Sequence, residues 1–205
     1  MIDVKVFSKA GIGKSNEDYV LQAELAPDKS LIVVCDGMGG LSYGATASKI
    51  IAHSIEKYLM QNLCANTPEQ LILNALNYAN DELAKECLLL KSKMGASIAL
   101  TLFAGNTCYY TWMGDVRIYL AKEGKTILLT KDHLAMDGNH SFLSRCVNGK
   151  PFRHFPEVGE LAISSGEEVY IATDGYYLHH EICSPLDSII ISEDDATIVC
   201  IRLSN

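Results

Sequence analysis

The stretch LIVVCDGMGG (residues 31–40) decides the fold, because it joins a continuous apolar run to a glycine-rich turn that carries one acid. A short apolar run with polar residues on both sides is typical of a buried strand. From about Tyr43 the apolar residues recur with helical spacing. Their shared face holds Ile51, Ile55, Tyr58 and Leu59. The order predicts a buried strand that ends in Asp36, followed by a helix that runs to about Leu63.

A second helix is predicted to begin at Thr67-Pro68-Glu69-Gln70. The threonine caps the helix, the proline fits its first turn, and the glutamine side chain closes a capping box. Its apolar face consists of Leu71, Ile72, Ala75, Leu76, Ala79 and Leu83.

From Ser97 onward the pattern is that of strands, with Gly105-Asn106 and Glu123-Gly124 as turns. Strands are expected at residues 97–104, 107–113, 116–121, 125–130, 167–173 and 196–203. Between Asp132 and Glu167 only loop is expected. Strands, two adjacent long helices and then antiparallel strands predict a layered α+β arrangement in a single domain over residues 1–205.

The composition narrows the class of protein. The chain has 205 residues, a formal net charge of −8 and seven scattered cysteines without a C-x-x-C pair. Nucleic acid is not an expected partner, because phosphate backbones need a basic face. The cysteines indicate reduced thiols rather than disulfides or a zinc site. No apolar run approaches the roughly 18 residues that span a membrane, and Asp3 and Lys5 interrupt any signal-peptide layout. We therefore expect a cytoplasmic protein.

Four acids stand at the ends of predicted strands. Asp36 follows LIVVC, Asp115 follows YYTWMG, Asp174 follows VYIAT, and Asp194 precedes ATIVCIRL. Carboxylate oxygens are the ligands that magnesium and manganese prefer, and two such ions can hold a hydroxide and a phosphate ester together. A lone Asp-Gly pair after a strand is usually only a turn. The metal hypothesis therefore depends on the set of four.

The stretch GIGKSNED (residues 11–18) raises a rival hypothesis, a nucleotide-binding loop. Such a loop has the spacing G-x-x-x-x-G-K-[ST], and Gly13, Lys14 and Ser15 match its second half. The position of the first glycine is Ser8, and the chain lacks βαβ alternation. Both observations argue against this reading.

Blocks of sequence in order along nearly the whole chain resemble the metal-dependent protein phosphatase family, type 2C, in its compact bacterial form. They are KSNED (14–18), VVCDGMGG (33–40), MGAS (94–97), MGDVRIY (113–119), TKDH (130–133), LSRCVNG (143–149), IATDG (171–175) and DDATIV (194–199). The resemblance implies a four-layer α-β-β-α sandwich of two antiparallel sheets flanked by helices. It also implies that NED is the functional half of GKSNED and that GKS borders a phosphate site.

Carried over residue by residue, the resemblance makes Asp36, Asp174 and Asp194 the catalytic residues. Asp36 is then expected to bridge two Mn²⁺ or Mg²⁺ ions. The Gly37 carbonyl completes one ion's shell, and Asp174 and Asp194 complete the other.

The same resemblance adds three further acids to the metal ligands. Glu17 and Asp18 are expected near the ion on the Gly37 side, mostly through water. Asp115 matches the acid that holds a weaker third ion together with Asp174.

Some positions depart from the family pattern. Gly13 occupies the place of an arginine that grips the substrate phosphate with two parallel N–H bonds. The neighbouring Lys14 supplies charge without that planar fork, so it is assigned to phosphate binding, with a solvated loop charge as the alternative. Asp195 replaces an asparagine and adds negative charge near the site. The stretch between Asp132 and Ser144 is much shorter than the family's flap, which predicts a more open cleft.

Four other residues have weaker expectations. Met38, where animal members carry a histidine, leaves no protein general acid. His133 is expected to be structural. Arg117 and Arg145 are expected to pair with acids and hold the scaffold, although Arg145 also remains open as a phosphate contact.

The activity that the resemblance implies is hydrolysis of phosphoserine and phosphothreonine in proteins by a hydroxide that bridges two divalent cations. The expected partner is a phosphoprotein, the substrate of a Ser/Thr kinase, and the chain is expected to act as a monomer. The missing arginine and the short flap support an alternative, a catalytically weak module of the same fold that binds phosphoproteins and regulates them.

Overall fold

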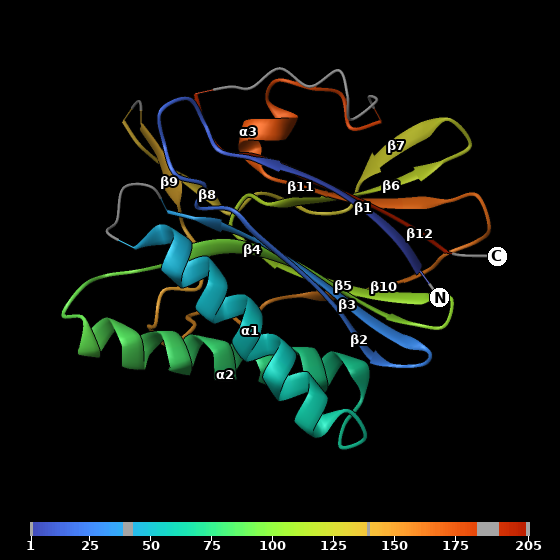
Figure 1. The fold of residues 1–205 in the computed structure, drawn as a ribbon, viewed down its shortest axis with the longest axis horizontal. Helices are drawn as coiled ribbons and strands as arrows, with labels where there is room; N and C mark the ends of the chain where they lie inside the picture. The colour runs from blue at the N-terminus through green and yellow to red at the C-terminus, as the bar shows by residue number, and fades with distance from the viewer. Residues whose placement is uncertain (1, 39–42, 139, 184–192, 204–205) are drawn as a thin grey trace.

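Two five-stranded antiparallel sheets form the framework of the protein, whose computed structural model describes residues 2–38, 43–138, 140–183 and 193–203. The strand order is β1-β12-β11-β6-β7 in the first sheet and β10-β5-β4-β3-β2 in the second, and β8 and β9 form a separate hairpin. Figure 1 shows the two sheets stacked on one another, with two long helices on the outer face of the second. The strands are β1 (Ile2–Lys9), β2 (Tyr19–Ala26), β3 (Lys29–Gly37), β4 (Ala96–Ala104), β5 (Thr107–Met113), β6 (Arg117–Lys122), β7 (Lys125–Leu128), β8 (Leu134–Asp137), β9 (His140–Leu143), β10 (Val158–Ala162), β11 (Glu168–Ala172) and β12 (Ala196–Leu203).

Strand β3 is buried on both faces, which explains its continuous apolar run. Leu31, Val33 and Cys35 belong to the core under the helices. Ile32 and Val34 belong to the core between the two sheets. Because apolar side chains are needed on both sides of such a strand, the alternation expected of a half-buried strand disappears.

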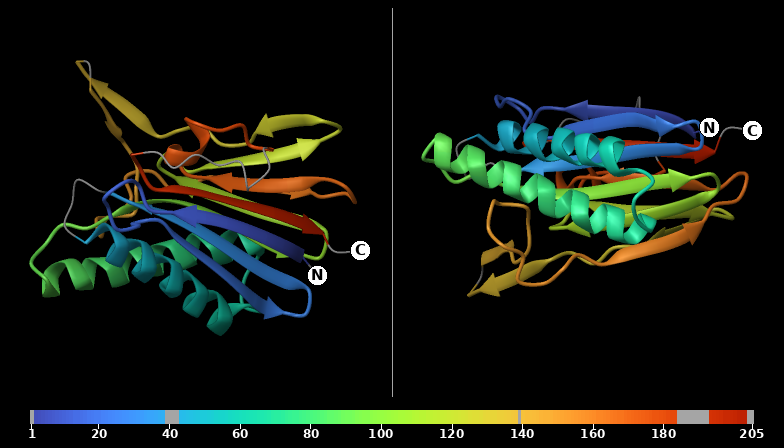
Figure 2. Two further views of the ribbon diagram at one scale, coloured as in Figure 1. Left: turned by 45° about the horizontal axis from the view of Figure 1, so that its top comes forward. Right: turned by 90° about the horizontal axis from the view of Figure 1, so that it is seen from below.

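Helices α1 (Gly44–Asn62) and α2 (Pro68–Leu89) cover the second sheet, as both views of Figure 2 show. Thr67 is the N-cap of α2, and its hydroxyl accepts the Gln70 N–H at 3.3 Å. The predicted second half of the capping box is wrong, because the Gln70 side chain instead donates to Asn74 Oδ1 at 2.9 Å. Within the described residues, no helix is both long and apolar enough to cross a membrane.

The outer face of the first sheet carries the short helix α3 (Asp174–Tyr177). Its fully buried Tyr176 packs with Ala172 and Cys200, and its ring meets that of Phe7 edge to face with centroids 6.5 Å apart. The predicted α+β fold of two antiparallel sheets flanked by helices is confirmed. Among the described residues, the fourth layer is this single turn of helix. All seven cysteines are free thiols.

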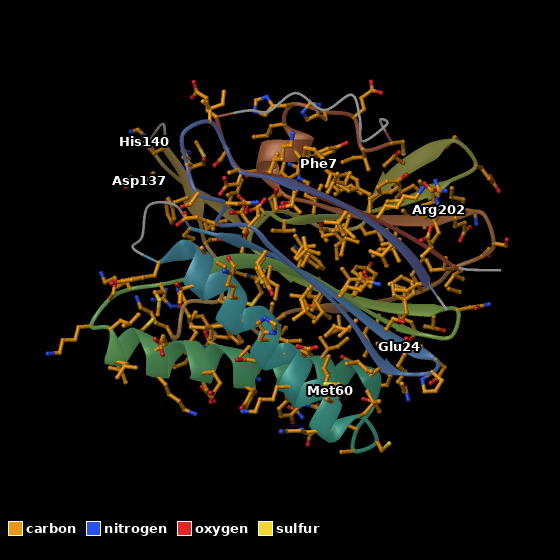
Figure 3. The ribbon with its side chains drawn as sticks, viewed as in Figure 1. Phe7, Glu24, Met60, Asp137, His140 and Arg202 are labelled. Carbon is orange, nitrogen blue, oxygen red and sulfur yellow. The ribbon has the colours of Figure 1, made fainter. Side chains whose placement is uncertain are left out.

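The segment between Asp132 and Glu167 is more ordered than expected. In place of loop alone, it forms the β8–β9 hairpin and the edge strand β10, which pairs with β5. These strands have mostly exposed or half-buried side chains, so they lack the apolar alternation that would predict them. Figure 3 labels Asp137 and His140 at the tip of the hairpin.

Candidate functional site

A cavity of about 730 Å³ opens where the ends of several strands meet. Seven of the eight residues assigned to a metal or phosphate role lie on its wall: Lys14, Glu17, Asp36, Gly37, Asp115, Asp174 and Asp194. Asp18 does not line the cavity. The remaining lining residues are Gly13, Ser15, Met38, Ser97, Leu143 and Asp195.

Sheet register brings acids from distant parts of the chain to this cavity. On the second sheet, Asp36 at the end of β3 is the register partner of Ser97 at the start of β4. On the first sheet, β11 runs antiparallel to β12, and the Thr173 N–H donates to the Thr197 carbonyl at 3.0 Å. The end of β11 and the start of β12 therefore meet, which explains why Asp174 and Asp194 share one wall.

Burial and repulsion between carboxylates raise the pKa values of Asp36, Asp115 and Asp174. Burial, followed by repulsion from Asp18 and Asp174, raises the pKa of Asp36 well above its ordinary value. Burial, followed by the charges of Asp115 and Asp194, raises the pKa of Asp174 to about 6. The pKa of Asp115 is also raised, mainly by burial. A site of this kind favours either protons or cations, because both reduce the repulsion.

Asp18 lies behind the cavity wall and is almost completely buried, with 7% exposed. The Thr173 hydroxyl donates to its Oδ2 at 3.0 Å. Its other oxygen, Oδ1, is buried and has no hydrogen-bond partner in the described structure. Burial raises the pKa of Asp18 to about 7. A buried carboxylate oxygen without a donor is a position where positive charge would be stabilising.

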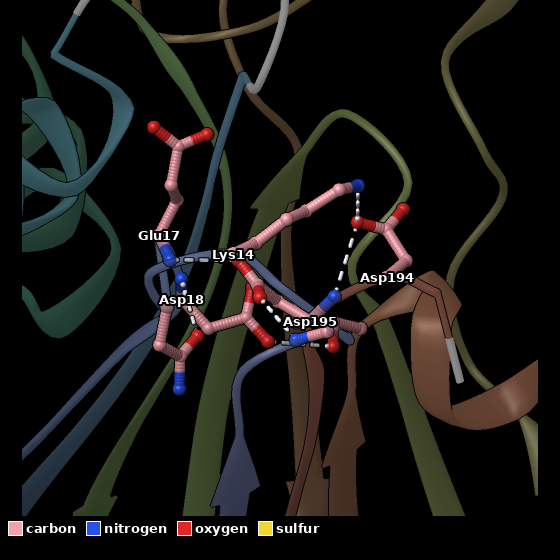
Figure 4. A network of polar contacts seen from close by, with 8 residues as sticks. Lys14, Glu17, Asp18, Asp194 and Asp195 are labelled. Atoms are coloured by element: carbon pink, nitrogen blue, oxygen red, sulfur yellow. Dashed lines mark hydrogen bonds and ion pairs between the residues drawn. The ribbon is translucent and has the colours of Figure 1, made fainter. Parts of the chain in front are cut away.

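Asp195 fixes the loop that carries the NED residues. Its carboxylate accepts the backbone N–H of Gly11 at 2.8 Å and that of Glu17 at 2.7 Å. Figure 4 shows Asp195 beside Glu17. The sequence predicted only an additional negative charge near the site. In the structure that charge is compensated by two N–H donors, so Asp195 is a clamp that holds the N-terminal loop against β12.

Gly37 allows two segments to approach closely at the end of β3. Its N–H donates to the Glu17 carbonyl at 3.2 Å. A Cβ at this position would lie 2.6 Å from the backbone of Gly44 at the start of α1. Any other residue would therefore separate β3 from α1 and move Glu17.

Lys14 forms an ion pair with Asp194, one of the predicted metal ligands. Its Nζ lies 3.6 Å from Asp194 Oδ1, and both side chains are more than half exposed. This contact places the lysine charge inside the acidic cavity (Figure 4). The lysine charge therefore lies beside the acids of the cavity, where it offsets part of their negative charge.

The donors suit a hard divalent cation. Among the described residues, no three Asp, Glu, His or Cys side chains lie in a geometry that could hold a metal ion. The available donors are carboxylate and carbonyl oxygens, the ligands of magnesium and manganese, and the Asp18 oxygen without a donor adds one more. A bound cation would offset the negative charges of these carboxylates, so they could lie closer together than they do without it.

Sequence reasoning missed Ser97 and Leu143 as residues of the cavity wall. Ser97 is buried, with 1% exposed, and its hydroxyl lowers the pKa of Asp115 against the effect of burial. Its position in the MGAS block, in register with Asp36, is the signal that could have identified it. Leu143 at the end of β9 begins the LSRCVNG block, but it reaches the cavity through a hairpin that the sequence did not predict.

The weaker expectations have mixed outcomes. Arg117 donates to Asp132 through Nε at 2.9 Å and Nη2 at 2.7 Å, as a scaffold arginine should. Arg145 does not pair with an acid in the described part of the chain, and its Nη1 lies 3.4 Å from His133 Nε2. His133 stacks on Trp112, with ring centroids 5.6 Å apart. Arg145 therefore remains available to an anion.

Comparison with known proteins adds independent evidence. The family model described as Protein phosphatase 2C matches residues 8–193. Protein phosphatase 1K, mitochondrial, of Xenopus laevis is 29% identical over 132 residues, which are 62% of this chain and 34% of that protein. A Mycoplasma genitalium protein provisionally named a protein phosphatase is 29% identical over 135 residues, 61% of this chain and 52% of that protein. The match thus spans about half of the Mycoplasma protein's length and about a third of the Xenopus protein's length.

Solved structures agree in fold over the full length. The serine/threonine phosphatase PstP of Mycobacterium tuberculosis superposes with a TM-score of 0.82 at 20% identity, covering 100% of this chain and 99% of that one. The catalytic domain of PstP in complex with two manganese ions gives a TM-score of 0.79 at 20% identity, with the same coverage.

Removing the Asp195 carboxylate should destabilise the protein. Asp195→Ala leaves two N–H groups without an acceptor, so we expect its free energy of unfolding to fall by about 2–5 kcal/mol. Asp195→Asn keeps one acceptor oxygen and should lose roughly half as much. Urea unfolding measures both, with the exposed Asp81→Ala as control. A stable Asp195→Ala variant would show that the clamp is unimportant.

The raised pKa values predict how the metal-free protein depends on pH. Asp18 titrates near 7 when folded and near 3.8 when unfolded, so the folded state binds more protons in this window. Its contribution to stability is fully present below about pH 4 and is lost as the pH rises through about 7.

Asp18→Asn should flatten that decline, because the amide does not titrate. Urea unfolding in EDTA between pH 4 and pH 8 gives both slopes, and Asp81→Asn should behave as the wild type. If the free energy of unfolding changes equally with pH in Asp18→Asn and in the wild type, the raised pKa of Asp18 is contradicted.

Proposed function

Because this chain belongs to the protein phosphatase 2C family, we propose that residues 1–205 form one domain that hydrolyses phosphoserine and phosphothreonine in proteins with the help of two manganese or magnesium ions. The observation that carries the proposal is the cavity in which Asp36, Asp115, Asp174 and Asp194 meet at the ends of strands. These acids come from four separate segments, and the raised pKa values of Asp36, Asp115 and Asp174 indicate a need for positive charge.

The residues would hold the ions as follows. Asp36 would be the central ligand, the Gly37 carbonyl would serve one ion, and Asp174 and Asp194 would serve the other. Fixed backbone on both sheets supports this role, because Asp36 follows the buried residues 31–35 of β3 and Asp174 begins α3.

Three other acids would add negative charge close to the two ions. Glu17 lies on the cavity wall beside Gly37, and Asp18 lies directly behind it with one oxygen free of hydrogen bonds. Asp115 would join Asp174 at a third, weaker ion. The solved PstP domain with two manganese ions supports a divalent metal here by similarity of fold.

The protein's own groups orient the substrate. Bound divalent cations supply an activated water for in-line attack on phosphorus and offset the charge that develops on the phosphate oxygens. Lys14 Nζ would leave Asp194 and bind a phosphate oxygen as a point charge. Met38 on the cavity wall carries no proton to donate, so this position supplies no general acid for the leaving serine oxygen.

We place the protein in the cytoplasm as a monomer that removes phosphate from the protein substrate of a Ser/Thr kinase, with no role for nucleic acid or a membrane. The net charge of −8 agrees with the first exclusion. A module that only binds phosphoproteins is not favoured, since every proposed metal acid is present.

Manganese-dependent activity tests the proposal. Purified protein with millimolar manganese should release phosphate from para-nitrophenyl phosphate and from a phosphoserine peptide. Asp36→Asn and Asp174→Asn should each lower kcat/KM by about 100-fold or more, because the ions lose a central ligand. Asp81→Asn, on the exposed face of α2, is the matched control. Full activity in EDTA would refute the metal-dependent mechanism.

Lys14 should have opposite effects on metal and on substrate. Lys14→Met removes the positive charge beside Asp194, so less manganese should be needed for half-maximal activity, while KM for the phosphopeptide rises about tenfold through loss of one charged contact. Lys14→Arg should restore KM. Lys5→Met, on the exposed part of β1, should change neither constant. If metal requirement and KM change in the same direction, the proposed exchange of partners is wrong.

A further inference from the structure

A second cavity of about 450 Å³ adjoins the acidic one and has the opposite charge. The two cavities share Leu143. The wall of the second carries the cationic residues Arg145, Lys150 and Arg153 together with His154, and none of its described lining residues is an acid. The protein has 17 basic and 25 acidic residues, so the chain as a whole is negatively charged. The groove, with three cations and no acid among its described lining residues, is locally positive.

The cations of this groove are not used by the fold. Neither Lys150 nor Arg153 takes part in an ion pair within the described part of the chain. Arg145 contacts His133 Nε2 at 3.4 Å, while the Gly114 N–H lies 3.2 Å from Nδ1 of the same ring. A neutral imidazole accepts at only one nitrogen, so Arg145 is held weakly. All three cations can therefore turn toward an anion.

The backbone of the groove is nevertheless fixed. Asn80 on α2 is buried, with 4% exposed; its Nδ2 donates to the Lys150 carbonyl at 2.8 Å and its Oδ1 accepts the Gly149 N–H at 2.9 Å. Gly149 has φ +74°, and a Cβ there would lie 2.9 Å from Ala84. The segment between β9 and β10, which passes beside α2 in Figure 2, is thus anchored just before Lys150 extends into solvent.

We propose that this groove is a subsite for acidic residues that flank the phosphorylated residue of the protein substrate. The proposal rests on the proposed function for the location of the phosphate. With the phosphate in the acidic cavity, neighbouring residues of an extended peptide pass Leu143 and reach the cations. Complementary charge at such a rim selects among substrates and speeds their encounter.

Two phosphoserine peptides test the subsite, one with glutamate and one with glutamine on both sides of the phosphoserine. At low salt the wild type should show a kcat/KM about three- to tenfold higher for the glutamate peptide, the size expected of two or three partly exposed ion pairs. The preference should fall at about 0.5 M salt, where such pairs are screened.

The variant Lys150→Gln/Arg153→Gln should lose the preference for glutamate. Lys5→Gln/Lys125→Gln removes the same charge from the exposed parts of β1 and β7 and should keep it. Equal rates for both peptides in the wild type, or a preference that survives in Lys150→Gln/Arg153→Gln, would overturn the subsite.

A binding experiment separates the subsite from catalysis. The same peptides with unmodified serine cannot be hydrolysed, so their binding can be measured by fluorescence anisotropy in manganese. The wild type should bind the glutamate peptide more tightly than the glutamine peptide. The variant Lys150→Gln/Arg153→Gln should bind both peptides equally. If para-nitrophenyl phosphate is not hydrolysed but this difference is found, the phosphatase assignment fails and the acidic-peptide site stands. If the two peptides bind equally, the subsite is refuted even in an active enzyme.

Discussion

Repulsion between carboxylates that the fold forces together is the constraint on which this structure depends. Six acids line one cavity: Glu17, Asp36, Asp115, Asp174, Asp194 and Asp195. Left to themselves such groups would separate or bind protons. They stay together because each is attached to backbone fixed by a large apolar core, under the helices, between the sheets or beneath α3. The favourable free energy of apolar packing thus offsets the unfavourable repulsion between these carboxylates.

Long elements buried on at least one face could be predicted from the sequence. β3 and the two long helices have continuous apolar faces. The expected bounds of β3 and α1 and the expected start of α2 lie within a residue or two of the observed ones. The placement of acids at strand ends was also predictable, because strands that meet at one edge of a sheet bring their terminal residues together.

The rest depends on contacts that leave no local pattern. β8, β9 and β10 have mainly exposed or half-buried side chains, so no apolar alternation marks them. Gln70 found a partner one turn along the helix rather than at the cap. Asp195 looked like surplus negative charge, and only tertiary structure reveals its two N–H donors. The basic groove likewise arises from a segment without periodicity that Asn80 holds in place.

The Asp195 clamp also has a consequence for how the protein matures on the ribosome. Gly11 and Asp195 are 184 positions apart, and β12 lies between β1 and β11 in the first sheet. The loop at residues 11–17 is therefore synthesised before β12 but can acquire its final shape only after Asp195 has emerged. A nascent chain that lacks β12 has neither a complete first sheet nor an ordered loop at residues 11–17, so premature release or C-terminal proteolysis should yield an inert fragment rather than a partly active one.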